Sequence, residues 1–66
     1  MELTVNGAGR SLPGGSTVAD LVRAVTDQQR GLAVAVNGEV VPRTGWSATA
    51  LRDGDRVEVL SAAQGG

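Results

Sequence analysis

Residues Leu32 to Val41 read LAVAVNGEVV, and they contain the clearest strand and turn pattern of the chain. The first five residues are apolar at both odd and even positions, as expected of a central strand that is covered on one face and sheltered on the other. The following Asn37-Gly38 pair is the strongest short signal for a hairpin turn, because both residues tolerate the positive φ that such a turn needs. Residues 39–41 then return, and Pro42 ends the pairing because proline has no N–H to donate. The stretch therefore predicts two antiparallel strands.

An amphipathic helix is expected before this hairpin. Its apolar residues recur every three or four positions, which places them along one side of a helix; they are Val18, Leu21, Val22 and Val25. Thr17 is the expected N-cap, and Asp20 falls at the third helical position, where a carboxylate can bond back to the cap backbone. The helix is expected to end around residues 26–30, with Gly31 closing the connection.

Strands are also expected near both ends of the chain. Glu2–Asn6 alternates apolar and polar residues, and Gly7–Gly9 is expected to turn the chain so that residues 10–12 return antiparallel. Near the other end, Asp53–Asp55 predicts a tight turn and Arg56–Ser61 predicts a final strand. The stretch from Arg43 to Thr49, which contains Trp46, is expected to form a single helical turn or a loop.

This order of elements predicts an α+β fold with a mixed sheet of four to five strands and one main helix on one face. A hairpin, a crossing helix and a last strand parallel beside the first make the β-grasp topology. We expect residues 1–61 to form a single domain and residues 62–66 a flexible C-terminal tail, because these five residues have little apolar bulk to anchor them. The expected main core consists of Leu3, Val5, Leu21, Val25, Val34, Val36, Val57 and Val59.

Composition narrows the possible functions. A chain of 66 residues, with 41% hydrophobic and 20% charged residues, suits one small globular domain. It contains no cysteine and no histidine, so it has neither the best side-chain nucleophile nor the usual base at neutral pH, and no Cys/His zinc site. We therefore expect no enzyme activity of its own, no metal and no cofactor.

Charge and hydropathy limit the partners. The formal net charge is −1 and no basic run occurs, which argues against nucleic acid as a partner. No apolar stretch approaches the roughly 18 residues that a membrane span needs, and the start of the chain lacks a secretory pattern. We expect a cytoplasmic protein without membrane contact.

The sequence closes on Gln64-Gly65-Gly66, which is the candidate functional segment. Glycine has no Cβ, so a Gly-Gly end can enter a narrow channel in a partner enzyme. The reacting group would be the carboxyl of Gly66. A carboxylate is a poor electrophile and needs activation, for instance as an acyl-adenylate, and the chain has no phosphate-binding loop with which to make one. An ATP-using partner is therefore expected.

A docking surface is expected beside this segment. If Val57 and Val59 face the core, Leu60 faces outward, and the small residues Ala33 and Ala35 share its face. Together they would make a shallow apolar patch.

Three other features have a structural and a functional interpretation. Trp46 is expected to cap the core, although an exposed tryptophan could anchor a partner. Asp53 and Asp55 are expected to build a turn, because two carboxylates are too few to hold a cation. Arg43 could bond local carbonyls or meet an acidic partner.

The whole chain resembles the ubiquitin-like sulfur carriers, and most closely the sulfur carrier family of thiamine biosynthesis. The resemblance includes Val40-Val41-Pro42-Arg43 followed by Trp46, and its most discriminating part is Pro42-Arg43 with Trp46 three residues later. The resemblance extends to the helix entry from Thr17 to Leu21, the strand end Val34–Asn37, the Leu51–Asp55 turn and the Gly-Gly pair. The chain departs from the family at Ala62-Ala63-Gln64, where such carriers often have bulkier apolar residues.

The resemblance implies a carrier. An E1-like adenylating enzyme would activate the Gly66 carboxyl with ATP, and sulfur from a persulfide sulfur donor would convert it to a thiocarboxylate. Thiazole synthase would then take the sulfur while it builds the thiazole ring.

Other functions remain open from the sequence. The chain could be a molybdopterin-synthase-type sulfur carrier, or a ubiquitin-like modifier that is conjugated to lysines through Gly66. It could also be a β-grasp interaction module with an inert tail.

Overall fold

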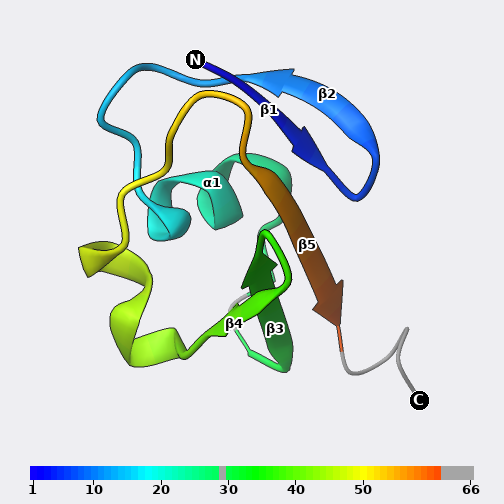
Figure 1. Cartoon of the computed structure of the whole chain (residues 1–66). Coiled ribbons are helices and arrows are strands. Elements are labelled where there is room, and N and C mark those ends of the chain that lie inside the picture. Colours follow the sequence, from blue (N-terminus) through cyan, green and yellow to red (C-terminus); the bar gives the residue numbers. More distant parts are fainter. Residues whose placement is uncertain (29, 62–66) are drawn as a thin grey trace.

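The computed structural model describes residues 1–28 and 30–61, which form a five-stranded mixed sheet with one main helix (Figure 1). The strands lie in the order β2-β1-β5-β3-β4. β1 pairs parallel with β5, whereas β1 with β2, β3 with β4 and β3 with β5 pair antiparallel. The bounds of the elements are β1 Glu2–Val5, β2 Ala8–Ser11, α1 Val18–Val25, β3 Leu32–Val36, β4 Glu39–Val41, the short 3₁₀ helix η1 Arg43–Ala48, and β5 Arg56–Ser61. The predicted fold class, including the last strand parallel beside the first, is confirmed.

The first hairpin turns one residue earlier than the sequence pattern predicts. Asn6 and Gly7 have φ angles of 52° and 84°, so these two residues make the turn and β2 already begins at Ala8. The expected turn at Gly7–Gly9 is therefore wrong. Asn6-Gly7 is the same dipeptide as Asn37-Gly38, whose φ angles of 51° and 86° confirm the turn predicted for the second hairpin.

The helix α1 begins at the predicted cap. Thr17 Oγ1 accepts a hydrogen bond from the Asp20 backbone N–H at 3.2 Å, and Asp20 Oδ2 accepts one from the Thr17 N–H at 2.9 Å. These bonds from Thr17, and in second place the nearby Arg23 guanidinium, hold the pKa of the Asp20 carboxyl below its ordinary value. The helix ends at Val25, with Thr26 in extended conformation as its C-cap.

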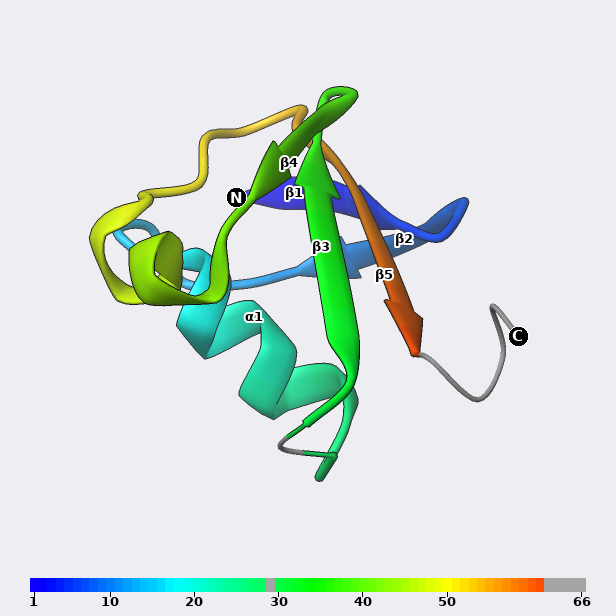
Figure 2. The same ribbon diagram turned by 90° about the horizontal axis from the view of Figure 1, so that it is seen from below.

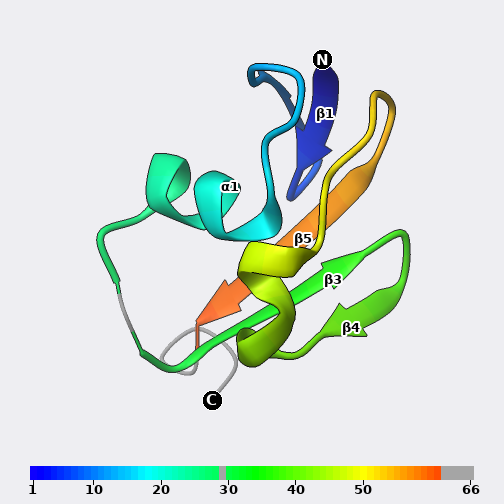
Figure 3. The same cartoon turned by 90° about the vertical axis from the view of Figure 1, so that its left-hand side faces the viewer.

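One face of the sheet packs on α1 and η1, as the side view shows (Figure 3). The buried core comprises Leu3, Val5, Val18, Leu21, Val22, Val34, Trp46, Leu51, Val57 and Val59. Two members of the expected core, Val25 and Val36, are only partly buried and pack against its edge. They lie at the last positions of α1 and β3, where fewer neighbours surround them.

The segment between η1 and β5 closes the core beside the start of the helix. The Val18 N–H donates to the Thr49 carbonyl and the Leu51 N–H donates to the Ser16 carbonyl, each at 2.9 Å. This pairing draws Leu51 into the core, where it is 4% exposed. No helix within the described part of the chain is long and apolar enough to cross a membrane.

Candidate functional site

The candidate site begins where β5 ends. β5 lies between β1 and β3, and its pairing with β3 continues to Ser61, opposite Leu32. Because β5 runs parallel to β1, Ser61 lies at the end of the sheet away from the N-terminus (Figure 2). The predicted site residues Gln64, Gly65 and Gly66, and the flexibility expected for residues 62–66, fall outside the described residues.

An apolar patch lies on the face of the sheet opposite the helix. Leu60 is 54% exposed, whereas its neighbour Val59 is buried, so the side chains alternate as the sequence predicts. Ala33 lies directly opposite Leu60 in the register, and Ala35 lies directly opposite Val40 of β4. Val40 is 75% exposed, the other large apolar side chain among the described residues that is turned to solvent. We call Ala33, Ala35, Val40 and Leu60 the outer patch; its role in docking stays a prediction.

Sequence reasoning missed Val40 as a member of this patch. The hairpin register gives the signal that could have found it, because a two-residue turn at Asn37-Gly38 pairs Val36 with Glu39 and therefore Ala35 with Val40. Glu58 shares the outer face, opposite Ala35 on the β5 side, and makes no salt bridge with any described residue. The outer patch thus has a carboxylate at its border.

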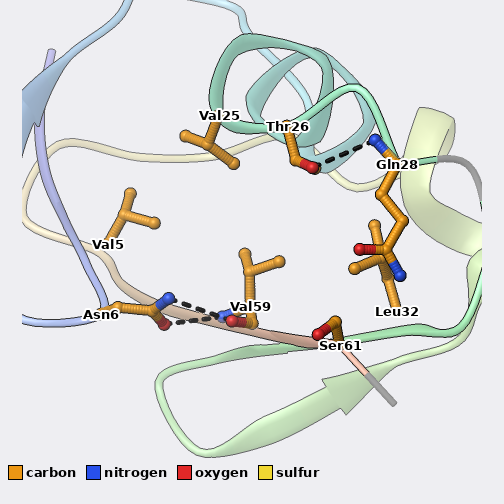
Figure 4. A pocket seen from close by; sticks show the side chains of 8 residues that line it. All are labelled: Val5, Asn6, Val25, Thr26, Gln28, Leu32, Val59 and Ser61. Carbon is orange, nitrogen blue, oxygen red and sulfur yellow. Dashed lines mark hydrogen bonds between the residues drawn. The ribbon is translucent and has the colours of Figure 1, made fainter. Parts of the chain in front are cut away.

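A hollow of about 230 Å³ lies beside the end of β5, on the helix side of the sheet (Figure 4). It is lined by Val5, Asn6, Val25, Thr26, Gln28, Leu32, Val59 and Ser61. At its edge, the Asn6 side chain forms two hydrogen bonds with the backbone of Val59: Nδ2 donates to the carbonyl at 3.0 Å, and Oδ1 accepts from the N–H at 2.8 Å. Sequence reasoning missed Asn6 because it placed the turn at Gly7–Gly9.

Trp46 caps the core, as the structural interpretation predicts. It is 8% exposed, and its Nε1–H donates to the Val41 carbonyl at 2.9 Å. The Arg43 guanidinium lies over the indole ring, 5.7 Å from its centroid. This stacking is a cation–π contact that neither interpretation of Arg43 foresaw.

The predicted Asp53–Asp55 turn is confirmed. Asp53 Oδ1 accepts from the Glu2 N–H at 2.6 Å, and Asp55 Oδ2 accepts from the Arg52 N–H at 2.8 Å. The two carboxylates are thus bonded to backbone amides, one at the start of β1 and one at the start of the turn. Within residues 1–28 and 30–61, no three metal-ligating side chains come together.

Comparison with known proteins places these features in a family. A family model described as the ThiS family matches residues 3–66. The chain is 30% identical over 66 residues to the sulfur carrier protein ThiS of Escherichia coli (strain K12), a match that covers 100% of both chains. It is also 33% identical over 66 residues to a thiazole synthase of Paramagnetospirillum magneticum, of which the matched part makes up 20%.

Solved structures agree with the sequence matches. The crystal structure of a thiamine biosynthesis protein (ThiS) from Geobacter metallireducens superposes with a TM-score of 0.83 at 38% identity, over 92% of this chain and 93% of that one. A solution structure of a thiamine biosynthesis protein from the same organism gives a TM-score of 0.73 at 40% identity, over 91% of this chain and 81% of the other.

Proposed function

Because the chain belongs to the ThiS family, the ubiquitin-like β-grasp sulfur carriers of thiamine biosynthesis, we propose that it carries sulfur as a thiocarboxylate on Gly66. The observation that supports this most is the match to a sulfur carrier over 100% of both chains. The composition adds a second argument, since a chain without cysteine has no thiol on which to carry sulfur. The C-terminal carboxyl is then the suitable group.

The first step would be activation by an E1-like adenylating enzyme. The Gly66 carboxylate attacks the α-phosphate of ATP, pyrophosphate leaves, and an acyl-adenylate forms. This converts a poor electrophile into a good one, because AMP is a far better leaving group than oxide. Since the step consumes ATP, we expect it to take place in the cytoplasm.

The second step would exchange oxygen for sulfur. The terminal sulfur of a protein persulfide attacks the acyl carbon and AMP leaves, which gives an acyl disulfide. A thiol then cleaves the sulfur–sulfur bond, so that the carrier keeps a thiocarboxylate and the two remaining sulfurs form a disulfide. The carrier supplies only its carboxyl to these steps, and the partner proteins supply the thiols.

Thiazole synthase is the proposed acceptor of the sulfur. A segment similar to this whole chain makes up a fifth of a protein named thiazole synthase, so in that protein a carrier-like segment and thiazole synthase share one polypeptide. This supports a contact between this chain and a thiazole synthase during sulfur transfer.

We further propose that the outer patch docks the partners. It is apolar and exposed at Leu60 and Val40, and it lies on β3, β4 and β5, the last of which is the strand that precedes residues 62–66. An enzyme that covers this patch would therefore have the carboxyl end of β5 within its footprint.

The function is tested by pyrophosphate–ATP exchange with the cognate adenylating enzyme. The intact chain should support exchange, whereas a variant lacking Gly65 and Gly66 should not, and both should unfold at similar temperatures. Exchange by the truncated variant would contradict the role of Gly66. If the activated chain formed only amide links to lysines of other proteins, the protein would be a modifier and the carrier function would be wrong.

A further inference from the structure

We propose that Asn6 is a positioning residue, which fixes the direction in which the chain leaves the sheet after β5. This inference rests on the proposed function, because it concerns delivery of the Gly66 carboxyl to the adenylating enzyme.

β1 ends at Val5, before the neighbouring β5 has reached its own end at Ser61. β1 and β5 pair in parallel only at Thr4 with Arg56 and at Val5 with Val57, and the last backbone bond runs from the Asn6 N–H to the Val57 carbonyl at 2.9 Å. Asn6 then turns the chain into β2 with a φ of 52°. No backbone of β1 is left beside Val59, although β5 continues to Ser61.

Beside Val59, the Asn6 side chain makes the two hydrogen bonds that a longer β1 would make with its backbone. Its amide presents an N–H donor and a C=O acceptor to β5, as a backbone peptide does, and both bond to Val59 (Figure 4). The N–H and carbonyl of Val59 on the β1 side are therefore satisfied, and the last part of β5 is held from both sides, by Asn6 and by β3. The hollow beside it would otherwise leave this edge of β5 open to water.

The turn alone does not require asparagine. Glycine and aspartate also suit a two-residue turn with positive φ, but glycine has no side-chain amide and aspartate cannot donate to the Val59 carbonyl. The choice of asparagine is thus explained by Val59 and not by the turn.

A matched asparagine lies at the other end of the same strand. Asn37 has a φ of 51°, precedes Gly38, and its Oδ1 accepts from the Arg56 N–H at 2.9 Å. Its Nδ2 donates to Asp55 Oδ1 at 3.0 Å. Asn37 therefore holds the start of β5, whereas Asn6 holds the part near its end.

The direction of β5 at its end matters more for Gly66 than its direction at its start, because the residues that lead to Gly66 follow this end. Five residues follow Ser61, and five extended residues span about 17 Å. A tilt of about 20° at the base would move the far end of such a segment by about 6 Å. Holding Val59 on both sides fixes the direction of β5 before the partner binds, which lowers the ordering cost of binding.

The test compares Asn6→Gly, Asn6→Asp and Asn37→Gly in the full chain. In the free protein, Asn6→Gly should speed hydrogen exchange of the Val59 amide by about tenfold, which corresponds to the net free energy of one hydrogen bond. Asn37→Gly should speed exchange of the Arg56 amide by a similar factor. In pyrophosphate–ATP exchange, Asn6→Gly should raise the KM for the carrier about tenfold with kcat within about twofold, and Asn6→Asp should give a smaller rise. Asn37→Gly should lower the melting temperature comparably but leave the KM unchanged.

A failure of the role of Asn6 and a failure of the proposed carrier function give different results in these measurements. If the wild-type chain supports exchange but Asn6→Gly and Asn37→Gly have the same KM, Asn6 has no positioning role. If Val59 exchanges at the same rate in Asn6→Gly, the hydrogen bonds do not hold β5 and the inference is wrong. If the wild-type chain is not adenylated at all, the proposed function fails, and the inference fails with it.

Discussion

Two large side chains, Leu21 and Trp46, fill part of the thin core. Leu21 is fully buried at the middle of α1, and Trp46 closes the core while its Nε1–H bonds to the Val41 carbonyl. Each large side chain in so small a domain therefore carries a substantial part of the stability.

Leu21→Ala should lower the free energy of unfolding by about 2–4 kcal/mol, because it removes buried apolar surface and leaves a cavity. Asp27→Ala is the control, since Asp27 is exposed beyond the end of the helix and its removal should change stability by less than about 0.5 kcal/mol. Urea denaturation of both variants checks this. Equal losses in the two variants would mean that the helix does not bury Leu21.

Residue spacing predicted the core only in part. Alternation identified Leu3, Val5, Val57 and Val59 correctly, because in a strand with one wet face the period of two assigns each side chain to a face. It gave no sign of Leu51, which lies outside any strand or helix and is buried through backbone pairing with Ser16. Such pairing between distant segments is a tertiary effect that local patterns do not contain.

Among the elements, α1 depends most visibly on its cap. Thr17 and Asp20 exchange side-chain and backbone hydrogen bonds, and Arg23 forms a salt bridge with Asp20 one turn later. The sequence predicted this cap because all its members lie within one helical turn.

The cap makes part of the stability depend on pH. The bonds from Thr17, with Arg23, lower the pKa of the Asp20 carboxyl in the folded protein below its ordinary value. The stabilisation is therefore fully present above about pH 4 and is lost as the pH falls through the lowered pKa. Asp20→Asn should be less stable than wild type at neutral pH, and the gap should shrink below about pH 4. Melting temperatures measured from pH 7 to pH 2 check this, with Asp27→Asn as control; a gap that stays constant would contradict it.

The proposed role of the outer patch in docking can also be tested. Leu60→Ser should raise the KM of the adenylating enzyme for the carrier several-fold while the melting temperature changes little, because Leu60 is already half exposed. Ala24→Ser, an exposed change on the helix, is the control and should leave the KM unchanged. An unaltered KM for Leu60→Ser, measured together with Val40→Ser, would show that the outer patch does not dock this enzyme.

In the molecule as a whole, β5 is the central strand of the sheet, and the residues up to Gly66 follow it in the chain. β5 pairs with β3 from Val57 to Ser61 and with β1 only over its first two residues, and an asparagine side chain bonds to it near each end. The sequence predicted the order of elements and the outward Leu60. It did not predict the role of Asn6, because the contact with Val59 joins residues 53 positions apart.

The central claim is that the Gly66 carboxyl carries the sulfur, and intact-mass spectrometry tests it most directly. The full chain is incubated with the adenylating enzyme, ATP, a persulfide donor and a thiol, and its mass is compared with that of the untreated chain. The expected result is a gain of about 16 Da, the difference between sulfur and oxygen, located at Gly66 by fragmentation and absent without ATP. An unchanged mass, or sulfur located anywhere else in the chain, would contradict the account.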